Sequence, residues 1–109
     1  MNTLNTAILP LGWQWSQEPE RSDLQAEYEI ELPETHPLQG VEVDVVAHRE
    51  GNDDILVRHR LHHGLVSVVH LSWARRKELP NHPTVEFTGS HAEFLAWELN
   101  TYGIGTAEP

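Results

Sequence analysis

The chain has 109 residues, no cysteine and a formal net charge of −10 at pH 7. This length is usual for one domain, which buries roughly two-thirds of the surface that the unfolded chain exposes. Without cysteine there are no disulfides and no thiolate zinc sites, so packing must stabilise the fold. No apolar stretch approaches the roughly 20 residues of a membrane-spanning helix, and the amino terminus lacks the pattern of a secretory signal. We therefore expect a cytoplasmic protein with no membrane partner.

The charge is distributed unevenly along the chain. Residues 1–47 hold nine acidic residues and one basic residue, residues 48–77 hold three acidic and six basic residues, and residues 78–109 hold five acidic residues and no basic one. An evenly acidic surface would repel nucleic acid, whose binding depends on Lys and Arg contacts with phosphates. The basic middle segment, which also contains most of the histidines, leaves that kind of contact open.

The first two elements are expected within residues 1–32. Residues 1–22 place two tryptophans among turn-forming residues, which favours a short strand or a packed arm. Between residues 23 and 32, apolar and polar side chains alternate strictly, and this period of two predicts a half-buried strand. The apolar members of the alternation are Leu24, Ala26, Tyr28, Ile30 and Leu32.

Four more strands are expected after the turn at residues 33–40. The alternation over residues 41–48 predicts a second strand, and the Gly, Asn and Asp content of residues 49–54 predicts a loop. Two runs rich in β-branched and apolar residues, 55–61 and 65–71, flank His62-His63-Gly64 and indicate a hairpin. A short strand is expected at residues 84–87.

A helix is expected at the carboxyl end. Ser90 and Glu93 have the spacing of a capping box, so the helix should begin there, run to about Tyr102 and end at Gly103. Its apolar arc is wide because Phe94 and Trp97 extend it, which suggests two packing surfaces.

These elements predict a mainly β, β-rich α+β fold. Our first choice is a small SH3-like antiparallel barrel, and the alternative is an open antiparallel sheet with the helix packed across one face. In either form we expect a single domain composed of an arm (1–22), a β core (23–89) and a helix (90–103).

A series of short motifs lies within residues 30–77. They are Ile30-Glu-Leu-Pro33, His36-Pro-Leu-Gln-Gly40, the hairpin around Gly64, and Leu71-Ser-Trp73. The series resembles a family of small uncharacterised SH3-like-barrel proteins encoded beside integrases and transposases of bacterial mobile elements. The chain departs from the family pattern at Ala74-Arg75, where the family has a Thr-Asp pair. The resemblance implies a barrel fold and a mobile-element setting.

Three groups of residues are candidate contact surfaces. Aromatic anchors dominate interface energetics, so Trp73, Phe94 and Trp97 are the expected partner-binding residues. A basic group could contact nucleic acid or an acidic protein segment, or could only neutralise the chain's own acids; it comprises Arg58, Arg60, Arg75, Arg76 and Lys77. If the first two long strands pair, five carboxylates would share one acidic face. Such a face could bind a basic partner, or it could simply be solvated and guard against edge-to-edge aggregation. The five residues are Glu27, Glu29, Glu31, Glu42 and Asp44.

Neither a metal site nor a catalytic site is expected. The histidines 59, 62, 63 and 70 are the only metal candidates, but zinc-site spacings are absent. If the hairpin forms, His59 and His70 could lie near each other across it, or strand alternation could bury one and expose the other. No nucleophile with a local base, carboxylate pair or phosphate loop stands out. We therefore expect no cofactor and no small-molecule substrate.

The function expected from these observations is that of a non-catalytic accessory subunit docked on a larger protein. That protein could belong to a DNA-processing or mobile-element system, and nucleic acid could then be contacted through it. The alternative is an acidic inhibitor or immunity protein that blocks a nucleic-acid-binding enzyme by charge complementarity.

Overall fold

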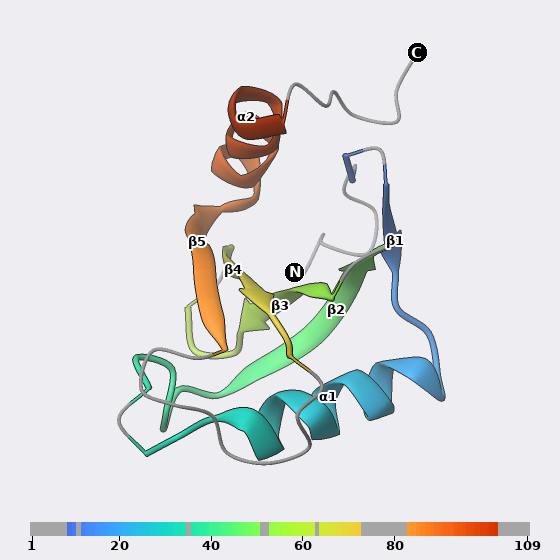
Figure 1. Ribbon diagram of the computed structural model, residues 1–109. Helices are drawn as coiled ribbons and strands as arrows, with labels where there is room; N and C mark the ends of the chain where they lie inside the picture. The colour runs from blue at the N-terminus through green and yellow to red at the C-terminus, as the bar shows by residue number, and fades with distance from the viewer. Residues whose placement is uncertain are drawn as a thin grey trace.

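The structure is a computed structural model that describes residues 9–10, 12–34, 36–50, 53–62, 64–72 and 83–102. Five strands form one antiparallel sheet in chain order, and two helices accompany it (Figure 1). The elements are β1 (Trp13–Trp15), α1 (Glu20–Glu31), β2 (Val43–Arg49), β3 (Asp54–His59), β4 (Leu65–His70), β5 (Thr84–Ser90) and α2 (His91–Tyr102). The fold is therefore α+β, and its sheet is open.

Both faces of the sheet are covered, each by one helix. Successive side chains of a strand point to opposite faces. In β3, Ile55 and Val57 pack with the core that includes α1, while Leu56 packs with the core that includes α2. Figure 1 accordingly shows the two helices on opposite sides of the sheet. This double coverage explains why β3 and β4 are apolar runs and show no clean alternation.

A β-bulge in β2 lets this one strand serve both cores. The register shifts between Val45 and Ala47, and a bulge reverses the alternation of side chains beyond it. Val43 and Val45 consequently pack on the α1 side, whereas Ala47 packs on the α2 side. Arg49, two residues further along the strand, also contacts α2.

The prediction of a strand at residues 23–32 is wrong, because this segment forms α1. Leu24, Tyr28 and Leu32 are spaced by four residues as well as by multiples of two. Leu24 and Tyr28 therefore lie on one face of the helix that packs on the sheet, and Leu32, at its C-cap, packs in the same core. The segment is rich in Glu, Gln, Ala and Leu, which favour helix, and contains Ile30 as its only β-branched residue. Pro33 stops the helix because its ring restricts the residue before it and its nitrogen carries no proton.

The predicted barrel is also wrong, and the open-sheet alternative is closer to the structure. β1 and β5 lie at the two edges of the sheet and do not pair with each other. Phe94 of α2 occupies the space between these edges, with its ring centroid 5.3 Å from that of Trp13 in β1 and 6.3 Å from that of Phe87 in β5. The helix closes the α2 face where a barrel would close by strand pairing.

Other predicted elements are confirmed. β1 lies within the predicted arm, and β2, the β3–β4 hairpin and β5 lie at the predicted places. The capping box of α2 is also present: the Glu93 N–H donates to Ser90 Oγ over 3.1 Å, and the Ser90 N–H donates to Glu93 Oε1 over 2.8 Å. Gly103 lies outside the described residues.

A buried ion cluster fastens α2 to the sheet. The guanidinium of Arg49 makes two hydrogen bonds to Glu98 of α2, and its Nε donates to Asp54 Oδ2 over 3.1 Å. Glu98 and Asp54 are 0% and 2% exposed. The same guanidinium lies 4.7 Å from the ring centroid of Trp13. One cation thus connects β1, β2, β3 and α2.

Replacing Arg49 should destabilise the protein strongly. Arg49→Met removes the cation between two buried carboxylates, and breaking a buried pair in this way costs about 3–5 kcal/mol. Adding Glu98→Leu should recover part of the loss, because one uncompensated charge is then gone. Urea denaturation measures both variants. A loss below about 1 kcal/mol, the range of an exposed ion pair, would contradict the assignment of Arg49 as a structural cation.

Removing the capping box should destabilise the protein less than replacing Arg49. Ser90→Ala leaves the Glu93 N–H without its side-chain acceptor and should lower the free energy of unfolding by about 0.5–2 kcal/mol. Thr101→Ala, at an exposed position of the same helix, is the matched control and should change it by less than about 0.5 kcal/mol. Equal losses in both variants would show that the box contributes nothing specific.

Candidate functional site

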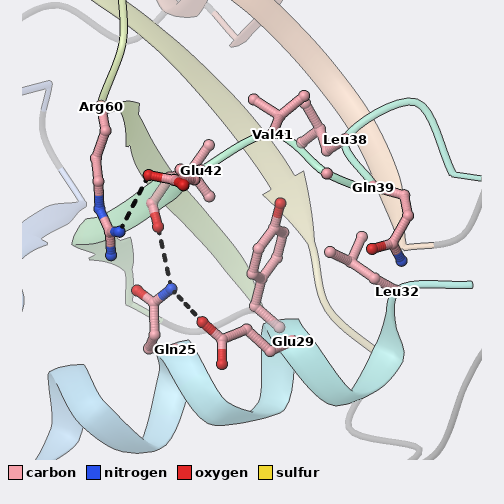
Figure 2. A pocket seen from close by; sticks show the side chains of 11 residues that line it. Gln25, Glu29, Leu32, Leu38, Gln39, Val41, Glu42 and Arg60 are labelled. Carbon is pink, nitrogen blue, oxygen red and sulfur yellow. Dashed lines mark hydrogen bonds and ion pairs between the residues drawn. The ribbon is translucent and has the colours of Figure 1, made fainter.

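A cavity of about 390 Å³ lies between α1 and the segment 38–43 that leads into β2. Figure 2 shows Gln25 and Glu29 on the helix side, with Leu38, Gln39 and Val41 on the segment opposite them. The volume lies within the roughly 300–1,000 Å³ typical of ligand sites. The lining consists of Gln25, Tyr28, Glu29, Leu32, Leu38, Gln39, Gly40, Val41, Glu42, Val43 and Arg60. It therefore combines an apolar wall with charged and amide groups.

Gln25 fixes one wall of the cavity to the sheet. Its Oε1 accepts from the Val45 N–H over 2.8 Å, and its Nε2 donates to the Val43 carbonyl over 3.1 Å. The side-chain amide thus satisfies two backbone groups of β2. Nε2 also donates to Glu29 Oε2 over 3.0 Å. These bonds hold α1 at a set distance from β2 and keep the cavity open.

The opposite wall is anchored by His36, which is 3% exposed. Its Nδ1 accepts from the Leu38 N–H over 3.0 Å and its Nε2 lies 2.6 Å from the Pro83 carbonyl, so the proton is assigned to Nε2. Gly40 completes the turn with a φ of 84°, a conformation that side chains disfavour. Both walls are therefore held by bonds within the chain, and the site is preformed.

The phenol of Tyr28, which lines this cavity, has an unused hydrogen-bonding group. Tyr28 is 2% exposed, and its hydroxyl has no hydrogen-bond partner among the described residues. Burial, together with the nearby Glu29, raises the pKa of the hydroxyl, so it keeps its proton. A buried donor without a partner costs roughly 1–3 kcal/mol.

Charged groups surround the mouth of the cavity. Arg60 donates to Asp44 Oδ1 over 2.7 Å and lies 3.5 Å from Glu42. The hydrogen bond from Arg60, assisted by a weaker one from Arg58, lowers the pKa of Asp44. Glu29 and Glu42 add negative charge on either side, and Figure 2 shows the Arg60–Glu42 ion pair at the edge of the site.

The five carboxylates of the predicted acidic face do not lie on a common face. Glu27, Glu29 and Glu31 belong to a helix and not to a strand, and Glu27 and Glu31 are buried. Glu31 Oε1 accepts from the Ser72 N–H over 3.0 Å and so joins α1 to the residues after β4. Glu29, Glu42 and Asp44 remain together near the cavity.

The predicted contact residues have mixed outcomes. Arg58 and Arg60 both pair with Asp44, as expected if these cations neutralise the chain's own acids. Phe94 is fully buried, so it packs the core and offers no surface to a partner, while Trp97 is half-buried against Phe87. Trp73, Arg75, Arg76 and Lys77 lie outside the described residues.

Of the two arrangements left open for His59 and His70, the structure has the one in which His59 is buried and His70 is exposed. The register pairs Asp54 with His70 and Arg58 with Val66, which places His59 at one end of the hairpin and His70 at the other. His62 is exposed in the turn, and residue 63 lies outside the described residues. A metal site formed by these histidines together is therefore not assembled.

Comparison with family models, with curated proteins and with solved structures found no match to this chain. Within the described residues, no helix has the length and apolar character needed to span a membrane. The site must therefore be interpreted from its own geometry.

Acid should weaken the fold through His59. This residue is 5% exposed, its Nε2 lies 2.8 Å from Ser67 Oγ, and burial lowers its pKa. The unfolded chain then binds a proton more readily than the folded one, so His59 contributes full stability above the ordinary pKa of about 6.5 and loses it as the pH falls below that value.

Urea denaturation between pH 7.5 and pH 5 measures this effect. The stability of the unmodified protein should decrease over this range, and His59→Gln should flatten part of the slope. His62→Gln should flatten it less, because His62 adds only the smaller contribution to the lowered pKa of His59. Identical slopes in all three proteins would exclude His59 as the responsible group.

Proposed function

We propose that the chain is a non-catalytic docking module that binds a larger protein through the cavity between α1 and the segment 38–43. The observation that carries the proposal is the preformed cavity itself, in which the apolar wall of Leu32, Leu38 and Val41 lies next to the carboxylates of Glu29 and Glu42. Because both walls are already held in place, binding costs little ordering of this domain.

The lining defines the chemistry of the bound segment. Leu32, Leu38 and Val41 present apolar surface that fits an aliphatic or aromatic side chain. Glu29 and Glu42 favour a neighbouring Lys or Arg of the partner, and the net charge of −10 attracts a basic protein. The proposed partner therefore presents an apolar side chain next to a cation on an exposed segment.

A DNA-processing or mobile-element partner remains a proposal that rests on the resemblance of residues 30–77. Arg58 and Arg60 are already paired with Asp44, so direct phosphate contact through them would require those pairs to open. The inhibitor alternative required five carboxylates on one face, and the position of Glu27 and Glu31 removes its main support.

Blocking the mouth of the cavity tests the docking proposal. Val41 is 37% exposed and lines the cavity, so Val41→Trp fills it without disturbing the core. Leu99, 54% exposed on α2, provides the matched control Leu99→Trp. Each variant is used as bait in a lysate of the source organism, and captured proteins are quantified by mass spectrometry.

We expect Val41→Trp to lose the proteins that the unmodified bait captures and Leu99→Trp to keep them. Glu42→Lys should weaken the same capture, most clearly at low salt, because it reverses a charge at the rim. Capture that is unchanged by Val41→Trp, or lost only in Leu99→Trp, would contradict docking through this cavity.

A further inference from the structure

Three potential metal ligands come together on the α2 face of the sheet, opposite to the cavity. Asp54, His70 and Glu86 lie on the adjacent strands β3, β4 and β5, and each offers one ligand atom, all within 4.8 Å of one another. Strand pairing places Asp54 directly opposite His70. Glu86 lies where the register of β4 and β5 shifts, between Val85 and Phe87, which are opposite Val69 and Val68.

We propose that Asp54, His70 and Glu86 form a binding site for a divalent transition-metal ion, of which Zn²⁺ is the best match. One imidazole nitrogen and two carboxylate oxygens are a ligand set that zinc accepts, whereas an all-oxygen set would favour magnesium or calcium. Three protein ligands leave a further position for water. His70 and Glu86 are exposed, so an ion can reach the site from solvent.

The charges around the site independently favour a cation. Arg49 is bonded to two carboxylates, those of Asp54 and Glu98, and a third carboxylate, that of Glu86, lies beside Asp54. The carboxylates of Asp54 and Glu86 thus lie close together, and a cation is the kind of ligand that such a pair attracts.

The surrounding bonds also orient the proposed ligands. Arg49 holds Oδ2 of Asp54, while Oδ1 lies 2.8 Å from Nδ1 of His70. Outer partners that fix a ligating carboxylate are typical of metal sites. Arg49 is itself fixed by its two bonds to Glu98. The competing account is that the Asp54–His70 hydrogen bond only positions two polar side chains, with no ion bound.

This inference does not depend on the docking proposal. The two sites lie on opposite faces of the sheet and have no residue in common. Failure of either test would therefore leave the other proposal standing.

Zinc titration of the full chain, made without a polyhistidine tag and treated with chelator, tests the inference. Isothermal titration calorimetry with ZnCl₂ at pH 7.5 should show one tight site and weaker binding to the remaining histidines. Glu86→Gln and His70→Gln should each weaken the tight site at least tenfold. Both positions are exposed, so folding should survive, and circular dichroism checks this.

Two matched controls separate the site from diffuse binding. His62→Gln removes an exposed histidine, and Glu20→Gln removes a carboxylate that lies 3.7 Å from His48. Both should keep the tight site, and MgCl₂ should bind at least tenfold more weakly than ZnCl₂ because imidazole suits zinc. The proposal is overturned if the unmodified chain shows no tight site, if Glu86→Gln binds zinc as tightly as the unmodified chain, or if the controls lose as much affinity as the site variants.

Discussion

The pairing of Arg49 with Glu98 and Asp54 is the interaction on which the arrangement of the sheet and α2 depends. Burying these carboxylates is unfavourable unless a cation meets them, and one guanidinium meets both while it stacks on Trp13. The bulge between Val45 and Ala47 allows β2 to contribute to the α2 side at this end of the strand. A local irregularity of the backbone and a buried charge thus determine together how the second helix is attached.

The two faces of the sheet consequently differ in what they leave available. On the α2 face, the aromatic side chains and the ion cluster fill the interior. The potential metal ligands His70 and Glu86 lie exposed at the border of the ion cluster. On the α1 face, Gln25 and His36 hold two walls apart. A preformed cavity lies between these walls, and this is the site that we propose for docking.

Local signals in the sequence are sufficient to predict most strands and α2. The β3–β4 hairpin followed from two apolar runs around a polar turn, and α2 followed from its capping box. Residues 23–32 were misassigned because Leu24, Tyr28 and Leu32 satisfy both a period of two and a spacing of four. The excess of helix-favouring residues over β-branched ones was the signal that could have decided it.

The sites were harder to predict because their residues are distant in sequence. The cavity depends on α1, so assigning that segment to a strand placed Tyr28 and Gln25 in the wrong surroundings. Asp54, His70 and Glu86 come from three strands and have no motif spacing, whereas the histidines clustered in sequence are separated by the hairpin register. The barrel was expected from the number, length and spacing of the strands and from the family resemblance, none of which reveals that Phe94 fills the space between the edges.

The central claim is that α1 packs on the sheet as one wall of a preformed cavity, with the Tyr28 hydroxyl enclosed and without a partner among the described residues. The free energy of unfolding of Tyr28→Phe, measured by urea denaturation against the unmodified protein, tests it without knowledge of the partner. Because the hydroxyl is buried and unpaired, its removal should leave stability unchanged or increase it by up to about 1–3 kcal/mol. A loss of about 1 kcal/mol or more, the net contribution of a satisfied hydrogen bond, would contradict the account.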